Sequence, residues 1–285
     1  MKTVNTISDV RAFVEEKRKA GKSVGFVPTM GYLHEGHASL MKAAKAKCDV
    51  VIVSIFVNPT QFGPGEDLET YPRDLKRDQN TCEAVGVDLI FAPDPSEMYP
   101  EGYSTYVDCE GEITKQLCGA SRPTHFKGVT SVVAKLFNIV QPDFAFFGQK
   151  DAQQVAVIEK MVRDLNMNVK IVPCPIVRES DGLAMSSRNT YLTAEQRKEA
   201  LVLSQSLEMA KLKILEGERN AEKIKAAIVG HIQSSPLAEI DYVSLVDVKT
   251  LLPLVAIEDE FLIALAVKFG KTRLIDNYRG QVSLS

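Results

Sequence analysis

Residues 24–37 read Val-Gly-Phe-Val-Pro-Thr-Met-Gly-Tyr-Leu-His-Glu-Gly-His, and this stretch decides the fold. Its apolar start, residues 24–27, predicts a buried strand, and the residues after it repeat apolar side chains at helical spacing. A strand, a tight turn with glycine and a helix start form a phosphate-binding arrangement, because a helix start offers unpaired N–H groups and partial positive charge. His34 and His37 share one side of that helix start, so we expect both to point at the same anion.

The His-x-Gly-His motif is short, and by itself it leaves chance occurrence or a pair of zinc ligands open. Zinc is the weaker alternative, because the sequence places no cysteine pair and no third histidine nearby to complete a tetrahedral site. Gly31 and Gly36 allow the main chain to approach a ligand closely or to take a positive φ. The motif therefore indicates an anion-binding turn, and segments elsewhere in the chain have to identify the anion.

Composition indicates an ordinary soluble protein. The chain has 285 residues, of which 45% are hydrophobic and 25% are charged, and its formal net charge is −3. Length favours one large or two modest domains, and the charge argues against nucleic acid as an obligate partner. The apolar runs are too short to cross a bilayer, and the N-terminus lacks a signal-peptide core. The five cysteines include no Cys-x-x-Cys pair, which predicts reduced thiols in the cytoplasm.

Apolar strand patterns alternate with helical patterns as far as about residue 176. This alternation predicts an α/β fold with a Rossmann-like, doubly wound and mostly parallel sheet. Ligands of such sheets bind at the carboxyl ends of the strands, where residues 58–65 form a predicted loop. Later in the chain, helical runs at 193–216 and 221–232 precede three strand patterns. We therefore predict a Rossmann-like domain over residues 1–176 and a smaller α+β C-terminal domain over residues 177–285.

Residues 177–189 form the second informative stretch, at the predicted domain junction. They read Val-Arg-Glu-Ser-Asp-Gly-Leu-Ala-Met-Ser-Ser-Arg-Asn. The hydroxyls of Ser186 and Ser187 and the fork of Arg188 can close over phosphate oxygens. The alternative is a solvated polar loop in which Ser186 caps a helix. The chain contains neither a P-loop motif nor a Gly-x-Gly-x-x-Gly after the first predicted strand, which disfavours both of those nucleotide-binding classes.

Together these motifs resemble a known family. His34-x-Gly36-His37 and Met185-Ser186-Ser187-Arg188 resemble the two signatures of the nucleotidylyl-transferase superfamily. More narrowly, five blocks in order are similar to the pantoate–β-alanine ligase (pantothenate synthetase) family, over essentially the whole chain: residues 28–37, 54–62, 122–129, 148–154 and 185–189. One departure is Gln149, where the family commonly has glutamate.

The resemblance implies a two-step ligation. ATP and pantoate first give pantoyl adenylate and pyrophosphate, and the amine of β-alanine then displaces AMP to give pantothenate. Residues 1–176 would bind the nucleotide and pantoate, and residues 177–285 would form a lid. The resemblance also implies Mg²⁺ beside the substrate ATP, with ligands that remain unknown. It further implies a cytoplasmic homodimer that binds small molecules and neither nucleic acid nor a membrane.

The resemblance also implies which residues act on ATP. We expect His34, His37 and Lys150 to act on the phosphates in catalysis, with His37 as a proton donor or charge stabiliser. We expect Asp151 to take the ribose hydroxyls and Val177 to present main-chain groups to the adenine. The full set expected to contact the nucleotide comprises Met30, Gly31, Tyr32, Leu33, His34, Glu35, Gly36, His37, Gly148, Gln149, Lys150, Asp151, Val177, Met185, Ser186, Ser187 and Arg188.

The other substrates have their own candidates. Gln61 and Gln154 can bind the oxygens of pantoate, since an amide both donates and accepts hydrogen bonds. Arg122 and His125 are second-rank candidates near the phosphates or the incoming β-alanine. Two alternatives stay open: a different adenylyl-transferring enzyme that acts on a nucleotide or an amino acid, and a protein that senses ATP without chemistry. The net charge of −3 disfavours a tRNA-binding synthetase.

Overall fold

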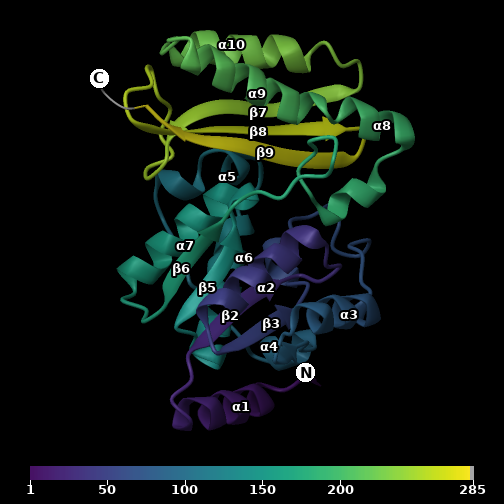
Figure 1. Cartoon of the computed structure of the whole chain (residues 1–285), viewed down its shortest axis with the longest axis vertical. Helices are drawn as coiled ribbons and strands as arrows, with labels where there is room; N and C mark the ends of the chain where they lie inside the picture. The colour runs from purple at the N-terminus through teal and green to yellow at the C-terminus, as the bar shows by residue number, and fades with distance from the viewer. Residues whose placement is uncertain (283–285) are drawn as a thin grey trace. The chain divides into compact units, whose positions relative to one another are not determined.

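The computed structural model describes residues 1–282, and the chain divides into two compact units (Figure 1). The first unit comprises Met1–Cys109, Arg122–Gln149 and Val157–Pro175. The second comprises Glu110–Ser121, Lys150–Ala156 and Ile176–Ser285, so the chain passes between the units five times. The domain division at residue 176 stays a prediction, and two segments from earlier in the chain are counted with the second unit.

The first unit contains a parallel sheet, which confirms the predicted α/β fold class. Its strands are β1 (Lys2–Val4), β2 (Val24–Thr29), β3 (Val50–Ile55), β4 (Leu89–Phe91), β5 (Phe144–Gly148) and β6 (Lys170–Cys174). Their order is β1-β4-β3-β2-β5-β6, and every pairing is parallel. The sheet therefore grows in one direction from β2 through β3 and in the other through β5, which creates a switch point between β2 and β5.

Helices cover both faces of this sheet. They are α1 (Ile7–Lys19), α2 (Glu35–Lys47), α3 (Leu75–Val85), the short α4 (Pro95–Met98) and α6 (His125–Val140), and α7 (Ala152–Asp164) begins in the second unit and ends in the first. On one face, Met41 of α2 and Cys82 of α3 pack in one cluster with Val53 of β3. On the other face, the ring of Phe137 in α6 meets Phe26 of β2 edge-on. The arrangement is thus doubly wound.

Capping side chains set the ends of the helices more sharply than apolar spacing does. The helix α3 begins after Asp74, whose side chain accepts a hydrogen bond from the main-chain N–H of Arg77, and it ends at Gly86 with φ 83°. The predicted run 193–216 is divided in the structure. Thr193 and Gln196 form a capping box for α8 (Ala194–Glu199), and a separate helix, α9 (Val202–Leu215), follows.

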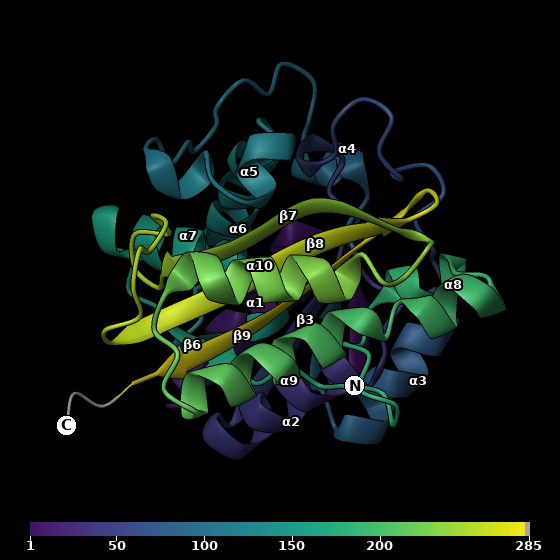
Figure 2. The same ribbon diagram turned by 90° about the horizontal axis from the view of Figure 1, so that it is seen from above.

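The second unit is built on an antiparallel sheet, which confirms the predicted smaller α+β part of the fold. Its strands β7 (Ala238–Asp247), β8 (Glu260–Phe269) and β9 (Thr272–Gln281) pair in that order. The helices α9 and α10 (Ala221–Ile232) lie along one face of the sheet (Figures 1 and 2). Leu207 and Ile228 from these helices pack in one buried cluster with Ile263 of β8.

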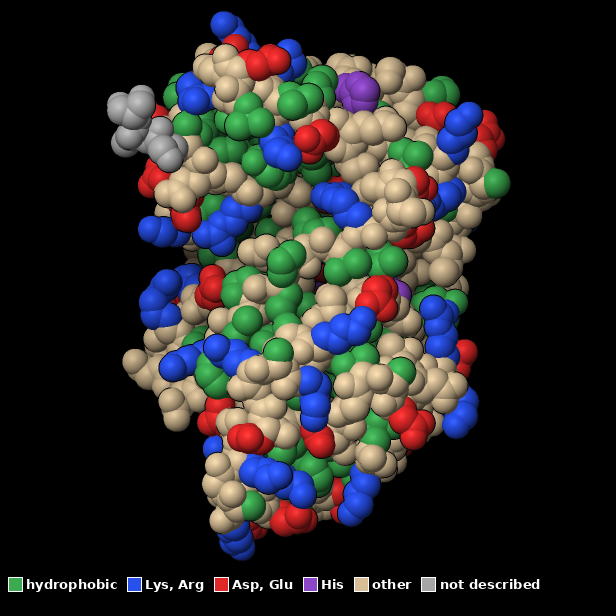
Figure 3. Space-filling view, in the orientation of Figure 1, with side chains coloured by type: hydrophobic (Ala, Val, Ile, Leu, Met, Phe, Trp, Pro, Cys, Tyr) green, Lys and Arg blue, Asp and Glu red, His purple; other side chains and the backbone are tan. Residues whose placement is uncertain are grey.

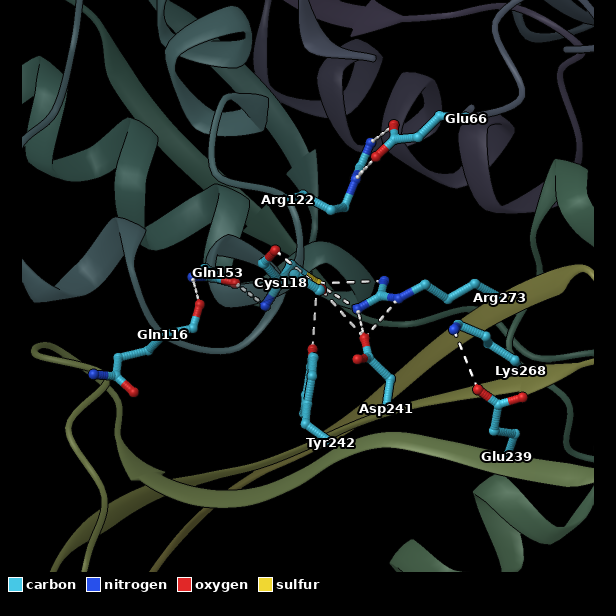
Figure 4. Close-up of polar contacts among 11 residues, drawn as sticks. Glu66, Gln116, Cys118, Arg122, Gln153, Glu239, Asp241, Tyr242, Lys268 and Arg273 are labelled. Carbon is cyan, nitrogen blue, oxygen red and sulfur yellow. Dashed lines mark hydrogen bonds and ion pairs between the residues drawn. The ribbon is translucent and has the colours of Figure 1, made fainter. Parts of the chain in front are cut away.

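Two short segments of the second unit come from earlier in the chain and contain short stretches of helix. The first contains η2 (Glu112–Thr114) and α5 (Cys118–Ser121), and the second contains the start of α7, after η3 (Gln149–Asp151). Figure 4 shows Cys118 between Tyr242 and Arg273, with its Sγ 3.3 Å from the Tyr242 Oη and 3.6 Å from two guanidinium nitrogens. Arg273 in turn donates to Asp241 at 2.7 Å. A register shift in β7 between Ile240 and Tyr242 supports this arrangement, because a β-bulge re-aims neighbouring side chains.

The surface fits the near-neutral composition. On the face shown in Figure 3, lysine and arginine side chains are interspersed with aspartate and glutamate. Within residues 1–282, no helix combines the length and the apolar character that crossing a membrane requires.

Candidate active site

The turn from β2 into α2 has a strained main chain that one buried carboxylate holds. Gly31 has φ 84° and Tyr32 has φ 52°, both in the left-handed region. The main-chain N–H groups of Tyr32 and Leu33 donate to the Asp78 carboxylate at 2.9 and 2.6 Å. A Cβ at position 31 would lie 2.9 Å from Asp78 Oδ2 and from a methyl of Ile55, so the turn requires glycine there.

Asp78 holds the turn of the predicted site, and the sequence did not indicate it. It lies on α3 and is 1% exposed. Burial raises its pKa above the ordinary value of 3.8, and the hydrogen bonds from Leu33 and Tyr32 act in the opposite direction. An aspartate in the first turn of a charged helix is usually solvent-exposed and interacts favourably with the helix dipole. The sequence therefore carried no signal for its contact with a turn 45 residues earlier.

The two histidines cap the start of α2 and each other. His34 is the N-cap residue, and its Nδ1 accepts the N–H of Gly36 at 3.1 Å. The Nδ1 of His37 accepts the N–H of His34 at 3.3 Å, and the ring centroids are 4.1 Å apart. Because Nδ1 accepts in both rings, the proton of each neutral ring is on Nε2. The helix start thus presents two imidazole N–H donors as well as its own partial positive charge.

Gln61 has a fixed amide orientation. It lies on η1 (Pro59–Gln61), after β3, and is 9% exposed. Asn58 donates through Nδ2 to the carbonyl of Gly128 at 3.2 Å, and a carbonyl can only accept. Nδ2 of Asn58 also donates to Oε1 of Gln61 at 3.1 Å, and Nε2 of Gln61 contacts Sδ of Met30 at 3.2 Å. Gln61 therefore turns its NH₂ group away from Asn58, which suits an acceptor such as a carboxylate or hydroxyl oxygen.

Asn58 and Tyr99 support this orientation and were not singled out from the sequence as site residues. Asn58 is 1% exposed, and its Oδ1 accepts a hydrogen bond from the Tyr99 hydroxyl at 2.7 Å. Burial raises the pKa of Tyr99 to about 12, so its hydroxyl stays protonated and can donate. A Tyr 41 residues from its partner has no local pattern that would have indicated this role.

Arg122 and His125 lie against the main chain of Gln61. The Arg122 guanidinium makes a two-pronged ion pair with Glu66 at 2.7 and 2.6 Å, and a longer contact of 3.4 Å with the Gln61 carbonyl. The Nδ1 of His125 is 2.9 Å from the same carbonyl oxygen. Burial raises the pKa of Glu66, but the hydrogen bond and charge of Arg122 outweigh it and bring the pKa below 4.5. Contact of either residue with a substrate stays a prediction.

The predicted site residues of the first unit lie at the carboxyl ends of the central strands β2 and β5. Main-chain register pairs Gly25 and Phe26 of β2 with Phe144 and Ala145 of β5, so the two strands end side by side. The turn of residues 30–37 follows β2, and β5 ends at Gly148 with Gln149 directly after it. Open α/β sheets bind their ligands at the carboxyl ends of the strands beside the switch point, which is where these residues lie.

The remaining predicted residues lie in the second unit. Lys150 forms an ion pair with the half-exposed Asp151 at 3.6 Å, and Gln154 follows on α7. Residues 177–185 form a short hairpin, in which the Met185 N–H donates to the Val177 carbonyl at 3.0 Å. Ser186 caps η4 (Ser187–Tyr191) by accepting the Arg188 N–H at 3.3 Å, as the alternative interpretation expected. A cap uses the oxygen lone pair and leaves the hydroxyl proton to donate.

The structure thus brings the predicted residues together in two sets. Residues 30–37, Gln61, Arg122, His125, Gly148 and Gln149 belong to the first unit; Lys150, Asp151, Gln154, Val177 and residues 185–188 belong to the second. Convergence of the two sets on one nucleotide stays a prediction. Over the described residues, no group of three or more histidine, cysteine, aspartate or glutamate side chains could hold a metal ion.

A doubly wound sheet with a donor-rich helix start at its switch point is the arrangement of a nucleotide-binding α/β protein. Comparison with known proteins narrows this class. A family model described as pantoate-beta-alanine ligase matches residues 2–279, and the chain belongs to this family.

Related proteins match this chain over nearly their whole lengths. The pantothenate synthetase of Pelotomaculum thermopropionicum is 60% identical over 277 residues, which are 97% of this chain and 98% of that protein. The pantothenate synthetase of Acetivibrio thermocellus is 59% identical over the same shares. The crystal structure of the Thermus thermophilus pantothenate synthetase matches with a TM-score of 0.94 at 46% identity and covers 98% of this chain and 99% of that one. A Francisella tularensis pantoate-beta-alanine ligase, complexed with beta-gamma ATP and beta-alanine, matches with a TM-score of 0.80 at 37% identity, over 98% and 97%.

Proposed function

We propose that this chain joins pantoate to β-alanine at the expense of ATP, through a pantoyl adenylate, and releases AMP and pyrophosphate. The observation that carries the proposal is the pair of imidazole donors at the start of α2, at the switch point of the sheet. Family membership supplies the substrates. It also supports this reaction over adenylyl transfer to another acceptor and over ATP sensing without chemistry.

The first step needs cationic and N–H groups around ATP. An oxygen of the pantoate carboxylate attacks the α-phosphorus, the new P–O bond forms, and the bond to the β-phosphate oxygen breaks. Negative charge moves onto the departing pyrophosphate, so groups that donate to it lower the barrier. We assign this role to His34, His37 and Lys150, with His37 as the group that donates to the phosphate oxygens as charge develops. Ser186, Ser187 and Arg188 close over the β- and γ-phosphates.

The second step needs pantoyl adenylate held in place while an amine arrives. The neutral amine of β-alanine attacks the acyl carbon, the amide bond forms as the nitrogen loses a proton to solvent, and AMP leaves with the electrons of the acyl–oxygen bond. We assign pantoate to Gln61 and Gln154, and the fixed NH₂ group of Gln61 supports its donation to a pantoate oxygen. Arg122 and His125 complete the surroundings of pantoate and β-alanine through their contacts with Gln61.

The remaining nucleotide contacts are shared between the two predicted domains. Residues 30–37, Gly148 and Gln149 surround the adenylate from the Rossmann-like domain, residues 1–176. Asp151 takes the ribose hydroxyls, and Val177 and Met185 meet the adenine. Residues 177–285 act as the lid. The hairpin bond between Met185 and Val177 supports a common role, because it keeps the adenine contacts and the phosphate-closing loop in one piece.

Mg²⁺ is part of the proposal as a companion of ATP. This ion is usually held by phosphates, waters and one or two carboxylates, so the phosphates of ATP would supply part of its ligand set. When bound, the ion would neutralise charge on the leaving pyrophosphate.

Compartment and assembly complete the proposal. All five cysteines are buried thiols outside any disulfide, which supports a reducing compartment such as the cytoplasm. Burial raises the pKa of Cys48, Cys82, Cys109 and Cys174, so these thiols stay protonated and unreactive. The homodimer rests on the family resemblance. Light scattering behind a sizing column tests it, and a single species at the monomer mass would contradict it.

Product release tests the reaction. With ATP and Mg²⁺ present, pyrophosphate release should depend on pantoate, and AMP release should depend on pantoate and β-alanine together. Release of pyrophosphate with a different acid, and none with pantoate, would point to another adenylyl-transferring enzyme. ATP binding without any release when both substrates are present would instead favour the sensor.

A further inference from the structure

Strand β9 carries two neighbouring buried polar residues that the assigned roles do not use. Asp276 is 2% exposed and Asn277 is 6% exposed. Successive side chains of a strand point to opposite faces of its sheet, so these neighbours reach in opposite directions. β9 pairs only with β8 in the described sheet and is therefore an edge strand. A buried polar pair at such a place requires partners on both faces.

Asp276 holds the hairpin that leads to Ser186. Its carboxylate accepts hydrogen bonds from Arg178 at 2.7 and 3.0 Å, a two-pronged ion pair. Arg178 also donates to the Gly182 carbonyl, at the tip of the same hairpin, at 3.0 Å. This face is the one that the helices cover, because a Cβ at Gly182 would lie 3.2 Å from the Ser204 hydroxyl of α9. One buried carboxylate thus fixes one arm of the hairpin and, through Arg178, its tip.

Asn277 holds the turn that carries Lys150. Its Nδ2 donates to the main-chain carbonyl of Lys150 at 2.9 Å. Gln153, on the same helix start, is 5% exposed. Its amide makes hydrogen bonds of 2.7–2.9 Å with main-chain groups of Ile113, Gln116 and Cys118. Figure 4 shows that Cys118 in turn meets Arg273 of β9. Arg273 is four residues from Asn277, so strand alternation places both on the same face of the sheet.

We propose that Asn277 is a positioning residue for the ligation, which keeps Lys150 in register with the Ser186–Arg188 loop that Asp276 holds. Adjacent positions on one strand then fix a cation, two hydroxyls and a guanidinium as a single set before ATP arrives. Such preorganisation matters because charged groups stabilise a transition state only when their places are set in advance. The inference rests on the proposed function, since Lys150 and Arg188 have a phosphate to act on only if the chain adenylates pantoate.

Asn277→Asp tests the inference with almost no change of shape. The substitution replaces the donor by a carboxylate oxygen, which then faces the Lys150 carbonyl oxygen across 2.9 Å. Two acceptors repel, so the turn moves away. We expect the KM for ATP to rise, and the single-turnover rate of adenylate formation to fall, each on the order of tenfold. The KM for pantoate should stay within about twofold.

Ile263→Val is the matched control. Ile263 lies on β8 of the same sheet, is fully buried, and belongs to the core beneath the helices. The variant destabilises the unit mildly and leaves both phosphate-binding segments untouched, so thermal melts and ATP kinetics separate stability from positioning. A folded Asn277→Asp variant with the ATP kinetics of Ile263→Val would overturn the inference.

A double-mutant cycle keeps the test valid if Asn277→Asp fails to fold. ATP binding is measured by calorimetry for Lys150→Ala, Asn277→Ala and the double variant. If Asn277 acts through Lys150, the double variant binds ATP as Lys150→Ala does. Additive losses would show that Asn277 acts elsewhere and would refute the inference. Failure of the proposed function is distinguishable, since the unmodified chain would then release no pyrophosphate in the presence of pantoate.

Discussion

Gly128→Ala should damage pantoate binding without touching a substrate. Gly128 lies on α6 where this helix meets η1, and a Cβ there would be 2.3 Å from the Thr60 carbonyl oxygen and 2.6 Å from two main-chain atoms of Gln61. Ordinary contact begins at 3.4 Å, so the shortfall is about 1 Å. The atoms are main chain and cannot rotate away. The methyl group therefore has to displace η1, and Gln61 with it.

The size of the effect follows from this displacement. Overpacking of this kind costs about 1–3 kcal/mol of stability. A misplacement of about 1 Å costs on the order of a hundredfold in rate. We expect kcat/KM for pantoate to fall by roughly that factor, and the KM for ATP to change by less than about threefold. The assay is steady-state pyrophosphate release at varied pantoate and varied ATP.

A second glycine gives the control. Gly230 lies inside α10, and a Cβ there would meet nothing within 4 Å. Gly230→Ala should raise stability by about 1 kcal/mol, because alanine favours a helix, and should leave the kinetics unchanged. The reasoning is refuted if Gly128→Ala folds and retains the pantoate kinetics of the unmodified chain.

Three further variants test single residues. His37→Ala should slow single-turnover adenylate formation by a factor on the order of hundreds, and an unchanged rate would remove His37 from the chemistry. Asp78→Asn places an NH₂ group opposite the main-chain N–H of Tyr32 or Leu33, so one of these donors loses its acceptor. Adenylate formation should therefore slow on the order of tenfold. A lower melting temperature with an unchanged rate would show that Asp78 has a purely structural role. The pKa of Glu66 is depressed below 4.5, so its pair with Arg122 stabilises the fold above that pH and is lost as pH falls through the folded pKa. Urea unfolding should therefore show a loss of stability on acidification that is smaller in Glu66→Gln, and equal losses would exclude this pair as the cause.

Local patterns in the sequence predicted most of the fold. The apolar, β-branched run of residues 50–53 identifies β3, and the helical spacing of residues 221–232 identifies α10, because each signal extends over several residues. Short elements escaped: β1 spans only Lys2–Val4 and gains its stability from pairing with β4. The general helical character of residues 71–84 does not show where α3 begins, because the cap at Asp74 sets that end.

The site residues that the sequence indicates have their partners nearby in the chain, and those that it does not indicate have distant partners. The turn at His34 and His37 could be found because the chemistry and the helix start lie within a few residues. Asp78, Tyr99 and Asn277 could not, since each acts on main chain or side chains 41 to 127 residues away. A single buried polar side chain has no period, and its partner is decided by packing over the whole unit.

The repeated passage of the chain between its two units has a consequence for synthesis on the ribosome. Cys118 meets an arginine 155 residues downstream, and Lys150 meets an asparagine 127 residues downstream. Both early segments leave the exit tunnel long before the last strand is translated, so neither has its sheet to dock on. Folding from the N-terminus onward can complete the parallel sheet early. The lysine turn can take its final place only once nearly the whole polypeptide has emerged.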